Sequence, residues 1–170
     1  MTTSDYQRLA EAKLKLHFAD VRTEWSIGKD ANDAFLRDVN RYAPRVDIAV
    51  GPFNTTRGRD SKIPKTPLVP DKLRDLFERL PSNKNPRCLL AIEVIYSGSS
   101  KHVLGDILNA GALGLYGLVI GLDTQMPKIR RIHRYLKMLA DLEKLPWLFQ
   151  NVVAISTADF DDLLGGTDRQ

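Results

Sequence analysis

The spacing of apolar and polar residues divides the first half of the chain into three expected helices and one strand. At the amino end, Ser4 can cap a helix that has apolar residues at helical intervals, namely Tyr6, Ala10, Leu14, Phe18 and Val21. Further helices are expected over residues 31–42 and 71–80. Between them, RVDIAVGPF (residues 45–53) predicts a strand, and residues 54–70, which contain three prolines, predict a loop.

The second half alternates between apolar runs and helical patterns. Residues 88–96, 115–122 and 151–156 are apolar runs that predict buried strands. They are followed in turn by a helix from Ser99 or Ser100, a long helix from Pro127 to about Lys144, and a short helix capped by Thr157. This alternation favours parallel crossovers, so we expect one α/β domain in which helices flank a central mixed sheet. Its expected parts are amino-terminal helices (4–43), a core (44–122) and a carboxyl-terminal helix–strand–helix unit (127–165).

Two of the predicted strands carry a carboxylate at their centre. Glu93 lies within CLLAIEVIY (residues 88–96), and Asp47 lies within VDIAV (residues 46–50). An unpaired buried charge costs several kcal/mol, so each acid needs a partner. For Glu93 the partner can be a basic side chain such as Arg45 or Arg87, a proton, or a metal ion. If the two strands are adjacent, repulsion between the acids favours a hard divalent cation, which oxygen ligands bind well.

Composition narrows the classes of function. The 170-residue chain is 43% hydrophobic and 27% charged, with a net charge of +4 that suits a polyanionic partner without requiring one. One cysteine and three histidines exclude a disulfide framework and a recognisable zinc site. The amino-terminal residues lack the apolar core of a signal peptide, and the longest uncharged stretch, residues 111–122, is shorter than the ~20 residues of a membrane helix. The sequence therefore predicts a cytoplasmic protein with no membrane partner.

The segment from Leu89 to Gly121 resembles the PD-(D/E)xK nuclease superfamily, which has the restriction-endonuclease-like fold. After the strand with Glu93 comes SGSSKHVLGDILNAGALGLYGLVIG (residues 97–121), which is similar to the helix and strand that follow the metal-binding strand in that family. The wider resemblance covers residues 30–122. It implies a restriction-endonuclease-like core.

In that family an acid on one strand and the acid of an E-x-K motif on the next strand hold the metal. The resemblance therefore implies that Asp47 and Glu93 are catalytic metal ligands for Mg²⁺ or Mn²⁺. It also implies that the carbonyl of Val94 is a main-chain ligand. The implied activity is the hydrolysis of DNA phosphodiester bonds by an endonuclease.

The motif departs from the family most clearly at Ile95, where the family has lysine, or sometimes Glu or Gln. Residues 93 and 95 share one face of a strand, so an apolar side chain lies where water activation needs a polar one. Some family members supply that group from the following helix. Lys101 is the first candidate for this catalytic role, and Asn109 is the second. Without such a group, the chain would be an inactive nuclease-fold protein that binds nucleic acid or serves as an assembly subunit.

Two groups of basic residues are candidates for contact with DNA phosphates. The loop offers Arg57, Arg59, Lys62 and Lys65, and the long helix offers Arg130, Arg131 and Arg134. A solvent-exposed charged face is the ordinary alternative for both groups.

Three lesser features complete the expectations. Glu24 is a candidate for a further acid, because some family members draw an additional metal ligand from an early helix. Symmetric cleavage of a duplex would favour a homodimer. The glycines at positions 111, 114 and 117 are expected to allow a helix to pack closely against the sheet.

Overall fold

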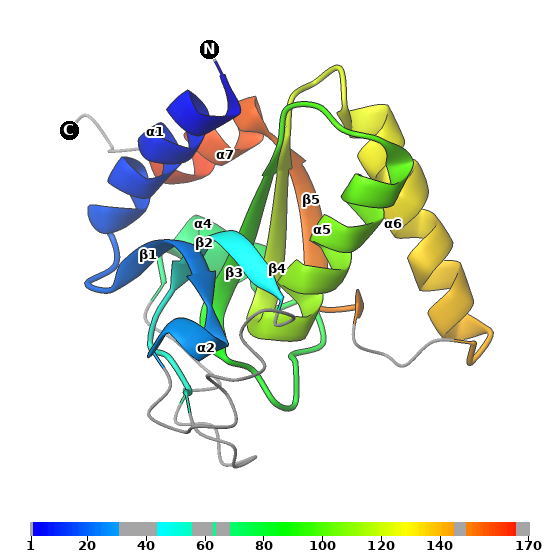
Figure 1. Cartoon of the computed structure of the whole chain (residues 1–170), viewed down its shortest axis with the longest axis horizontal. Helices are drawn as coiled ribbons and strands as arrows, with labels where there is room; N and C mark the ends of the chain where they lie inside the picture. Colours follow the sequence, from blue (N-terminus) through cyan, green and yellow to red (C-terminus); the bar gives the residue numbers. More distant parts are fainter. Residues whose placement is uncertain (1, 31–43, 56–62, 64–68, 145–148, 166–170) are drawn as a thin grey trace.

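A five-stranded sheet forms the centre of the part of the chain that the structure describes (Figure 1). This computed structural model describes residues 2–30, 44–55, 63, 69–144 and 149–165. The strands lie side by side in sequence order: β1 (Val21–Ser26), β2 (Arg45–Val50), β3 (Cys88–Ile95), β4 (Gly114–Gly121) and β5 (Val152–Ser156). β2 is antiparallel to both its neighbours, whereas β3, β4 and β5 are parallel. The predicted α/β fold with a mixed sheet is confirmed.

Helices cover both faces of this sheet (Figure 1). One face shares a hydrophobic core with α1 (Thr3–Lys15), α4 (Asp71–Phe77) and α7 (Thr157–Gly165). The other face packs against α5 (Ser100–Leu113) and α6 (Met126–Asp141), and the single turn α2 (Ile27–Asp30) follows β1. α5 connects β3 to β4 and α6 connects β4 to β5, as parallel strands require. Since both faces are covered, β3 and β4 are buried along their whole length, which explains their continuous apolar runs.

Short polar residues set the helix starts. The Thr2 hydroxyl accepts a hydrogen bond from the backbone N–H of Asp5 at 3.2 Å, and the Asp5 carboxylate accepts one from the backbone N–H of Thr2 at 2.8 Å. Ser156 makes the same reciprocal pair at the start of α7, with both distances 3.1 Å. The predicted caps Ser4 and Thr157 are therefore wrong by two positions and one position, whereas α5 begins at Ser100, one of the two expected starts, with Ser99 as its cap.

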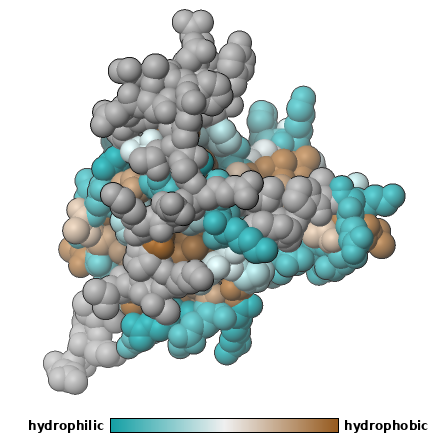
Figure 2. Space-filling view, turned by 90° about the horizontal axis from the view of Figure 1, so that it is seen from below, coloured by the Kyte–Doolittle hydropathy of each residue, from teal (hydrophilic) through white to brown (hydrophobic). Residues whose placement is uncertain are grey.

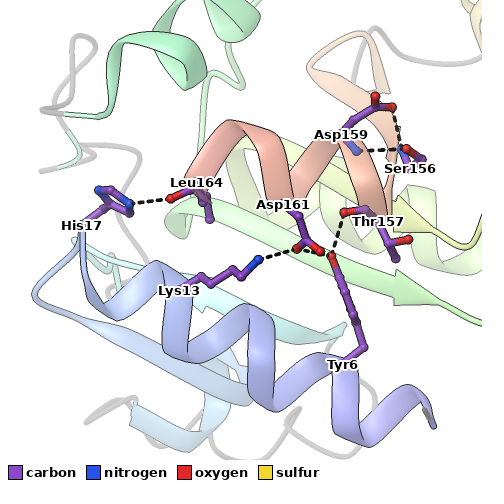
Figure 3. A network of polar contacts seen from close by, with 8 residues as sticks. All are labelled: Tyr6, Lys13, His17, Ser156, Thr157, Asp159, Asp161 and Leu164. Carbon is purple, nitrogen blue, oxygen red and sulfur yellow. Dashed lines mark hydrogen bonds and ion pairs between the residues drawn. The ribbon is translucent and has the colours of Figure 1, made fainter. Parts of the chain in front are cut away.

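The first and last helices are joined by polar contacts (Figure 3). The Tyr6 hydroxyl on α1 lies 3.1 Å from the Asp161 carboxylate and 3.1 Å from the carbonyl oxygen of the first residue of α7. Lys13 Nζ forms an ion pair with the same carboxylate at 2.8 Å. These contacts hold segments from opposite ends of the chain on one face of the sheet.

Several element boundaries differ from the sequence-based expectation. Strand β1, VRTEWS, was not predicted, and the first helix ends at Lys15, so Phe18 and Val21 lie beyond it. β2 ends at Val50, before the Gly51–Pro52 peptide, which is cis. α4 and α6 each end three residues earlier than expected, at Phe77 and Asp141. The helix expected over residues 31–42 lies outside the described residues.

Close packing between α5 and β4 is confirmed at Gly117. A Cβ atom there would lie 2.9 Å from the backbone carbonyl carbon of Ala110, a distance that real Cβ contacts essentially never reach. Two buried asparagines hold the same junction. The side-chain amides of Asn83 and Asn151 each donate to the carbonyl oxygens of Gly111 and Gly114, at 3.0–3.1 Å. Helix and strand are therefore fixed in one relative position.

The surface mixes hydrophilic and hydrophobic residues, and the face in Figure 2 shows separate apolar patches between polar ones. Large apolar side chains exposed on or just beyond α6 are Tyr135, Met138 and Leu142. Within the described ranges, we find no helix that combines the length and the apolar character needed to cross a membrane.

Candidate functional site

Strands β2 and β3 separate at the point where the two predicted acids lie. Their antiparallel pairing runs from Val50–Leu90 to Ile48–Ile92. Beyond that pair, β2 continues along β1 to Arg45, and β3 continues along β4 to Ile95. The sheet therefore forks immediately before Asp47 and Glu93, which are the next residues on the two strands.

The two carboxylates bridge this fork. Glu93 Oε2 accepts a hydrogen bond from the backbone N–H of Asp47 at 3.3 Å, and Asp47 Oδ2 accepts from the backbone N–H of Val94 at 2.8 Å. Each side chain thus satisfies an amide that the divergent strands leave without a ladder partner. A carboxylate has about four lone-pair positions, so one such bond leaves acceptor capacity on both acids.

Glu93 is held in a setting that disfavours its charge. It is only 5% exposed. Burial raises its pKa well above the usual value, and the negative charges of Asp47 and Asp106 raise it further. The backbone N–H of Asp47 and the side-chain amide of Asn109 act in the opposite direction, because they donate to the carboxylate. The site therefore makes the ionised form of Glu93 more costly than it is in water.

Helix α5 adds a third acid, Asp106. Burial, followed by the charge of Asp47, raises the pKa of Asp106 from 3.8 to about 6, while nearby His102 acts in the opposite direction. His102, Asp106 and Asn109 are spaced so that they share one side of the helix. The Asn109 amide also donates to the carbonyl of Arg45 at 3.3 Å, which ties this side of α5 to β2.

No cationic side chain pairs with Asp47 or Glu93 among the residues that the structure describes. Arg45, one of the expected partners, forms an ion pair with Glu24, with Nε and Oε2 3.1 Å apart. Arg87, the other, precedes β3 and is six positions from Glu93, about 20 Å away at a rise of ~3.3 Å per residue. The ion-pair explanation for the buried Glu93 is therefore not supported within the described ranges.

Other predicted residues are placed as follows. Ile95 is 2% exposed and packs in the hydrophobic cluster with α5 and α6. Lys101 lies exposed in the first turn of α5, and no described contact joins it to the three acids. Glu24 lies on β1 between the residues paired with Ile48 and Val46, not on an early helix, and has a positive φ of 48°.

The basic residues fall into two classes. Arg130, Arg131 and Arg134 have exposed side chains on α6. Arg57, Arg59, Lys62 and Lys65 lie outside the described residues, so their predicted role stays a prediction.

The described carboxylates alone do not form a complete set of metal ligands. In the described part of the chain, no three His, Cys, Asp or Glu side chains are arranged as a ligand set. Asp47 and Glu93 converge directly, while Asp106 acts on them through charge. Searches among protein-family models, curated proteins and solved structures found no match for this chain.

Asp106 is the member of this site that sequence reasoning missed. It lies four residues after His102 and three before Asn109, which was the second candidate for the missing catalytic group. Helical spacing alone places it on their side of the helix, and this was the signal that could have identified it.

Proposed function

We propose that this chain is a divalent-metal-dependent endonuclease domain of the PD-(D/E)xK type that hydrolyses DNA phosphodiester bonds. One observation carries the proposal. Asp47 and Glu93 converge where β2 and β3 separate, beside the charge of Asp106 and with no cationic partner among the described residues. Close, partly buried carboxylates without a cation reduce the stability of the folded state, and a bound cation would offset this cost.

The sheet supports the same proposal. In the family, the two metal-binding acids lie on neighbouring strands, and a helix and another strand follow the second acid. Here Asp47 is on β2, Glu93 is on the adjacent β3, and α5 and the parallel strand β4 follow. Fold likeness alone does not establish activity, so the acids carry more weight than the topology.

The donor set fits Mg²⁺ or Mn²⁺, because both ions prefer oxygen ligands and both offset carboxylate repulsion. Asp47 and Glu93 would hold the ion, the carbonyl of Val94 would add a main-chain oxygen, and Asp106 would add negative charge. When bound, such an ion activates water and neutralises charge on a phosphodiester.

Helix α5 borders open space at Gly105, next to Asp106. Gly105 precedes Asp106, and a Cβ atom added to it would meet nothing within 4 Å. Asn109 is the polar side chain that already donates to Glu93, whereas Lys101 would have to reach the site from the exposed first turn. Both remain candidates for orienting the attacking water, in place of the lysine that Ile95 replaces.

The first test asks whether Mg²⁺ or Mn²⁺ stabilises the protein. At about 100 times the dissociation constant, a bound ion adds ~2.7 kcal/mol, which raises the Tm of a chain of this size by roughly 5–10 °C. Glu93→Gln keeps the shape and removes the charge, so it should raise the metal-free Tm and abolish the metal-dependent rise. Glu78→Gln, at an exposed position, should keep the rise. A wild type that shows no metal-dependent change contradicts the metal site.

The second test is cleavage of plasmid and linear DNA with Mn²⁺ present. Asp47→Asn and Glu93→Gln should abolish cleavage. If Lys101 orients the water, Lys101→Ala should lower the rate at least ~10²-fold and leave the metal-dependent Tm rise intact. The same result with Asn109→Ala in place of Lys101→Ala would assign the role to Asn109.

The burial of Ile95 supports a second candidate, an inactive nuclease-fold protein that binds nucleic acid or acts as an assembly subunit. Ile95 is part of the hydrophobic core, so its position contributes no polar group to the acids. This candidate predicts salt-sensitive DNA binding with no cleavage in any divalent metal. Metal-dependent cleavage that Glu93→Gln abolishes would exclude it.

A further inference from the structure

A cavity of about 350 Å³ lies between α6 and β5. β5 is the last strand of the described sheet and lies two strands from β3, which carries Glu93 (Figure 1). Helix α6 contributes Arg130, His133, Arg134 and Lys137 to its lining. Residues 152–154 of β5 and Leu80 complete that lining. The volume lies in the range of small-molecule sites, ~300–1,000 Å³.

The polar lining of this cavity is cationic. Arg130, Arg134 and Lys137 follow one side of α6 at intervals of four and three residues, and their side chains are exposed. Among the described residues, no carboxylate belongs to the lining. The charge of Arg130 also acts on Asp159 at the start of α7, where it is one of the causes that lower the pKa of that carboxyl. Three positive charges around one cavity favour an anionic ligand.

His133 gives the cavity a second, more selective feature. Its Nε2 is buried and has no hydrogen-bond partner within the described ranges. The ring bonds to the backbone of Val152, and this bond favours the charged ring, so the other nitrogen donates to the Val152 carbonyl. Burial, and then the charge of Lys137, lowers the pKa of His133 to about 4. The imidazole is therefore neutral at physiological pH, and Nε2 presents an unused acceptor.

We propose that this cavity binds a phosphate group that carries a proton, as in inorganic phosphate or the monoanion of a phosphate monoester. The phosphate oxygens accept hydrogen bonds from Arg130, Arg134 and Lys137. The P–OH group donates to His133 Nε2, which would otherwise be left unpaired at a cost. A phosphodiester in a DNA backbone has no such proton and satisfies only the cations.

This site uses neither the acids nor a metal, so it can be tested separately from the proposed nuclease function, although Arg130 and Arg134 are also candidates for contact with DNA. Its ligand could be a small phosphorylated molecule or the terminal phosphate of a nucleic acid strand. Both present a monoester with a second pKa near ~6, so titrations at pH 6 keep a large share of either in the protonated form.

The experiment compares inorganic phosphate with sulfate at pH 6 in EDTA, by calorimetry and by NMR of the His133 ring nitrogens. Sulfate matches phosphate in shape but is a dianion with no proton to donate at pH 6, whereas inorganic phosphate is mostly a monoanion, so charge alone favours sulfate and a preference for phosphate reports the proton. We expect phosphate to bind at least ~10-fold more tightly than sulfate, and to move the Nε2 resonance of His133. Arg134→Ala should weaken both anions by ~10-fold or more. Arg131→Ala, on the same helix but outside the lining, should change neither.

His133→Phe isolates the proton acceptor, since it should reduce phosphate affinity to that of sulfate and leave sulfate unchanged. To identify the source, a mononucleotide is compared with dinucleotides that have a 5′-phosphate or a 5′-hydroxyl end. If the 5′-phosphorylated dinucleotide binds more tightly than the mononucleotide, the natural ligand is the end of a nucleic acid strand. If the mononucleotide binds as tightly as the 5′-phosphorylated dinucleotide, the natural ligand is a small molecule.

Three results would overturn the proposal: equal affinity for phosphate and sulfate, no binding of either anion, or equal losses in Arg131→Ala and Arg134→Ala. The NMR readout on the wild type decides the case even if His133→Phe misfolds. Because EDTA removes divalent ions, phosphate binding is measured without any contribution from the proposed metal site. A negative result here therefore does not bear on metal binding, and the reverse also holds. Glu93→Gln should retain phosphate binding in full.

Discussion

Removing the charge of Asp106 should stabilise the protein when no metal is present. The pKa of this carboxyl is raised from 3.8 to about 6 by burial and by Asp47, so the folded state disfavours the ionised form. Between pH 3.8 and about pH 6, Asp106 is therefore protonated to a larger extent in the folded state than in the unfolded state. Stability therefore falls as the pH rises from ~4 to ~6, and the full penalty applies above pH 6. Asp106→Asn keeps the shape and removes that penalty.

The magnitude follows from the two pKa values. They differ by about 2, and each whole step corresponds to ~1.4 kcal/mol, which gives an upper bound near ~3 kcal/mol. Asp106 is partly exposed, so solvent screens the repulsion and we reduce the figure to ~1–2 kcal/mol. The variant should gain this amount over the wild type at pH 7 and almost none of it at pH 4.

The assay is urea unfolding of both proteins at pH 4 and pH 7 in EDTA. Asp75→Asn, at an exposed position on α4, is the matched control and should leave stability within ~0.5 kcal/mol at both pH values. A variant that is no more stable than the wild type at pH 7 would refute the reasoning. A gain that is the same at both pH values would also refute it, because it could not arise from the carboxylate charge.

Three further changes test the packing around the site, each measured by urea unfolding in EDTA. Gly117→Ala should destabilise by ~1–3 kcal/mol, because its Cβ would lie 2.9 Å from the Ala110 backbone; unchanged stability would contradict the close packing. Gly105→Ala, with open space around it, should stabilise by ~0.5–1 kcal/mol through helix propensity, and a loss would show that the space is not open. Tyr6→Phe should cost ~1–2 kcal/mol, since it removes the hydroxyl that contacts Asp161 on α7 (Figure 3); a neutral result would mean that this contact adds nothing.

The central part of the fold could be predicted because its elements are buried. β3 and β4 lie inside the sheet with both faces covered, so their residues form uninterrupted apolar runs. α5 begins at a serine cap and buries Val103 and Ile107 at helical spacing. In these segments local propensity, pattern and burial agree, and such agreement makes sequence reasoning reliable.

The outer parts were harder to predict. β1 is an outer strand of the described sheet, and its polar run Arg22, Thr23 and Glu24, which is exposed at Thr23 and half-buried at the other two residues, weakens the strand signal. The end of β2 at Val50 depends on the backbone at Gly51, where a Cβ atom would lie 3.1 Å from the side chain of Asp20. These boundaries are set by tertiary contacts, to which a local pattern is insensitive.

Two acids of the candidate site were identified from the sequence, and the third was not. Asp47 and Glu93 were identifiable because a charge inside an apolar run is a local anomaly, and the fold then brings the two together. Asp106 shows no such anomaly, since a charged residue on a partly exposed helix is ordinary. Only the position of α5 over the fork between β2 and β3 gives it a raised pKa and makes it a neighbour of the strand acids. Three acids from three elements act on one another through charge, and no described cationic side chain pairs with Asp47 or Glu93. The candidate site therefore depends on this convergence, which the fold creates and the short motif alone does not encode.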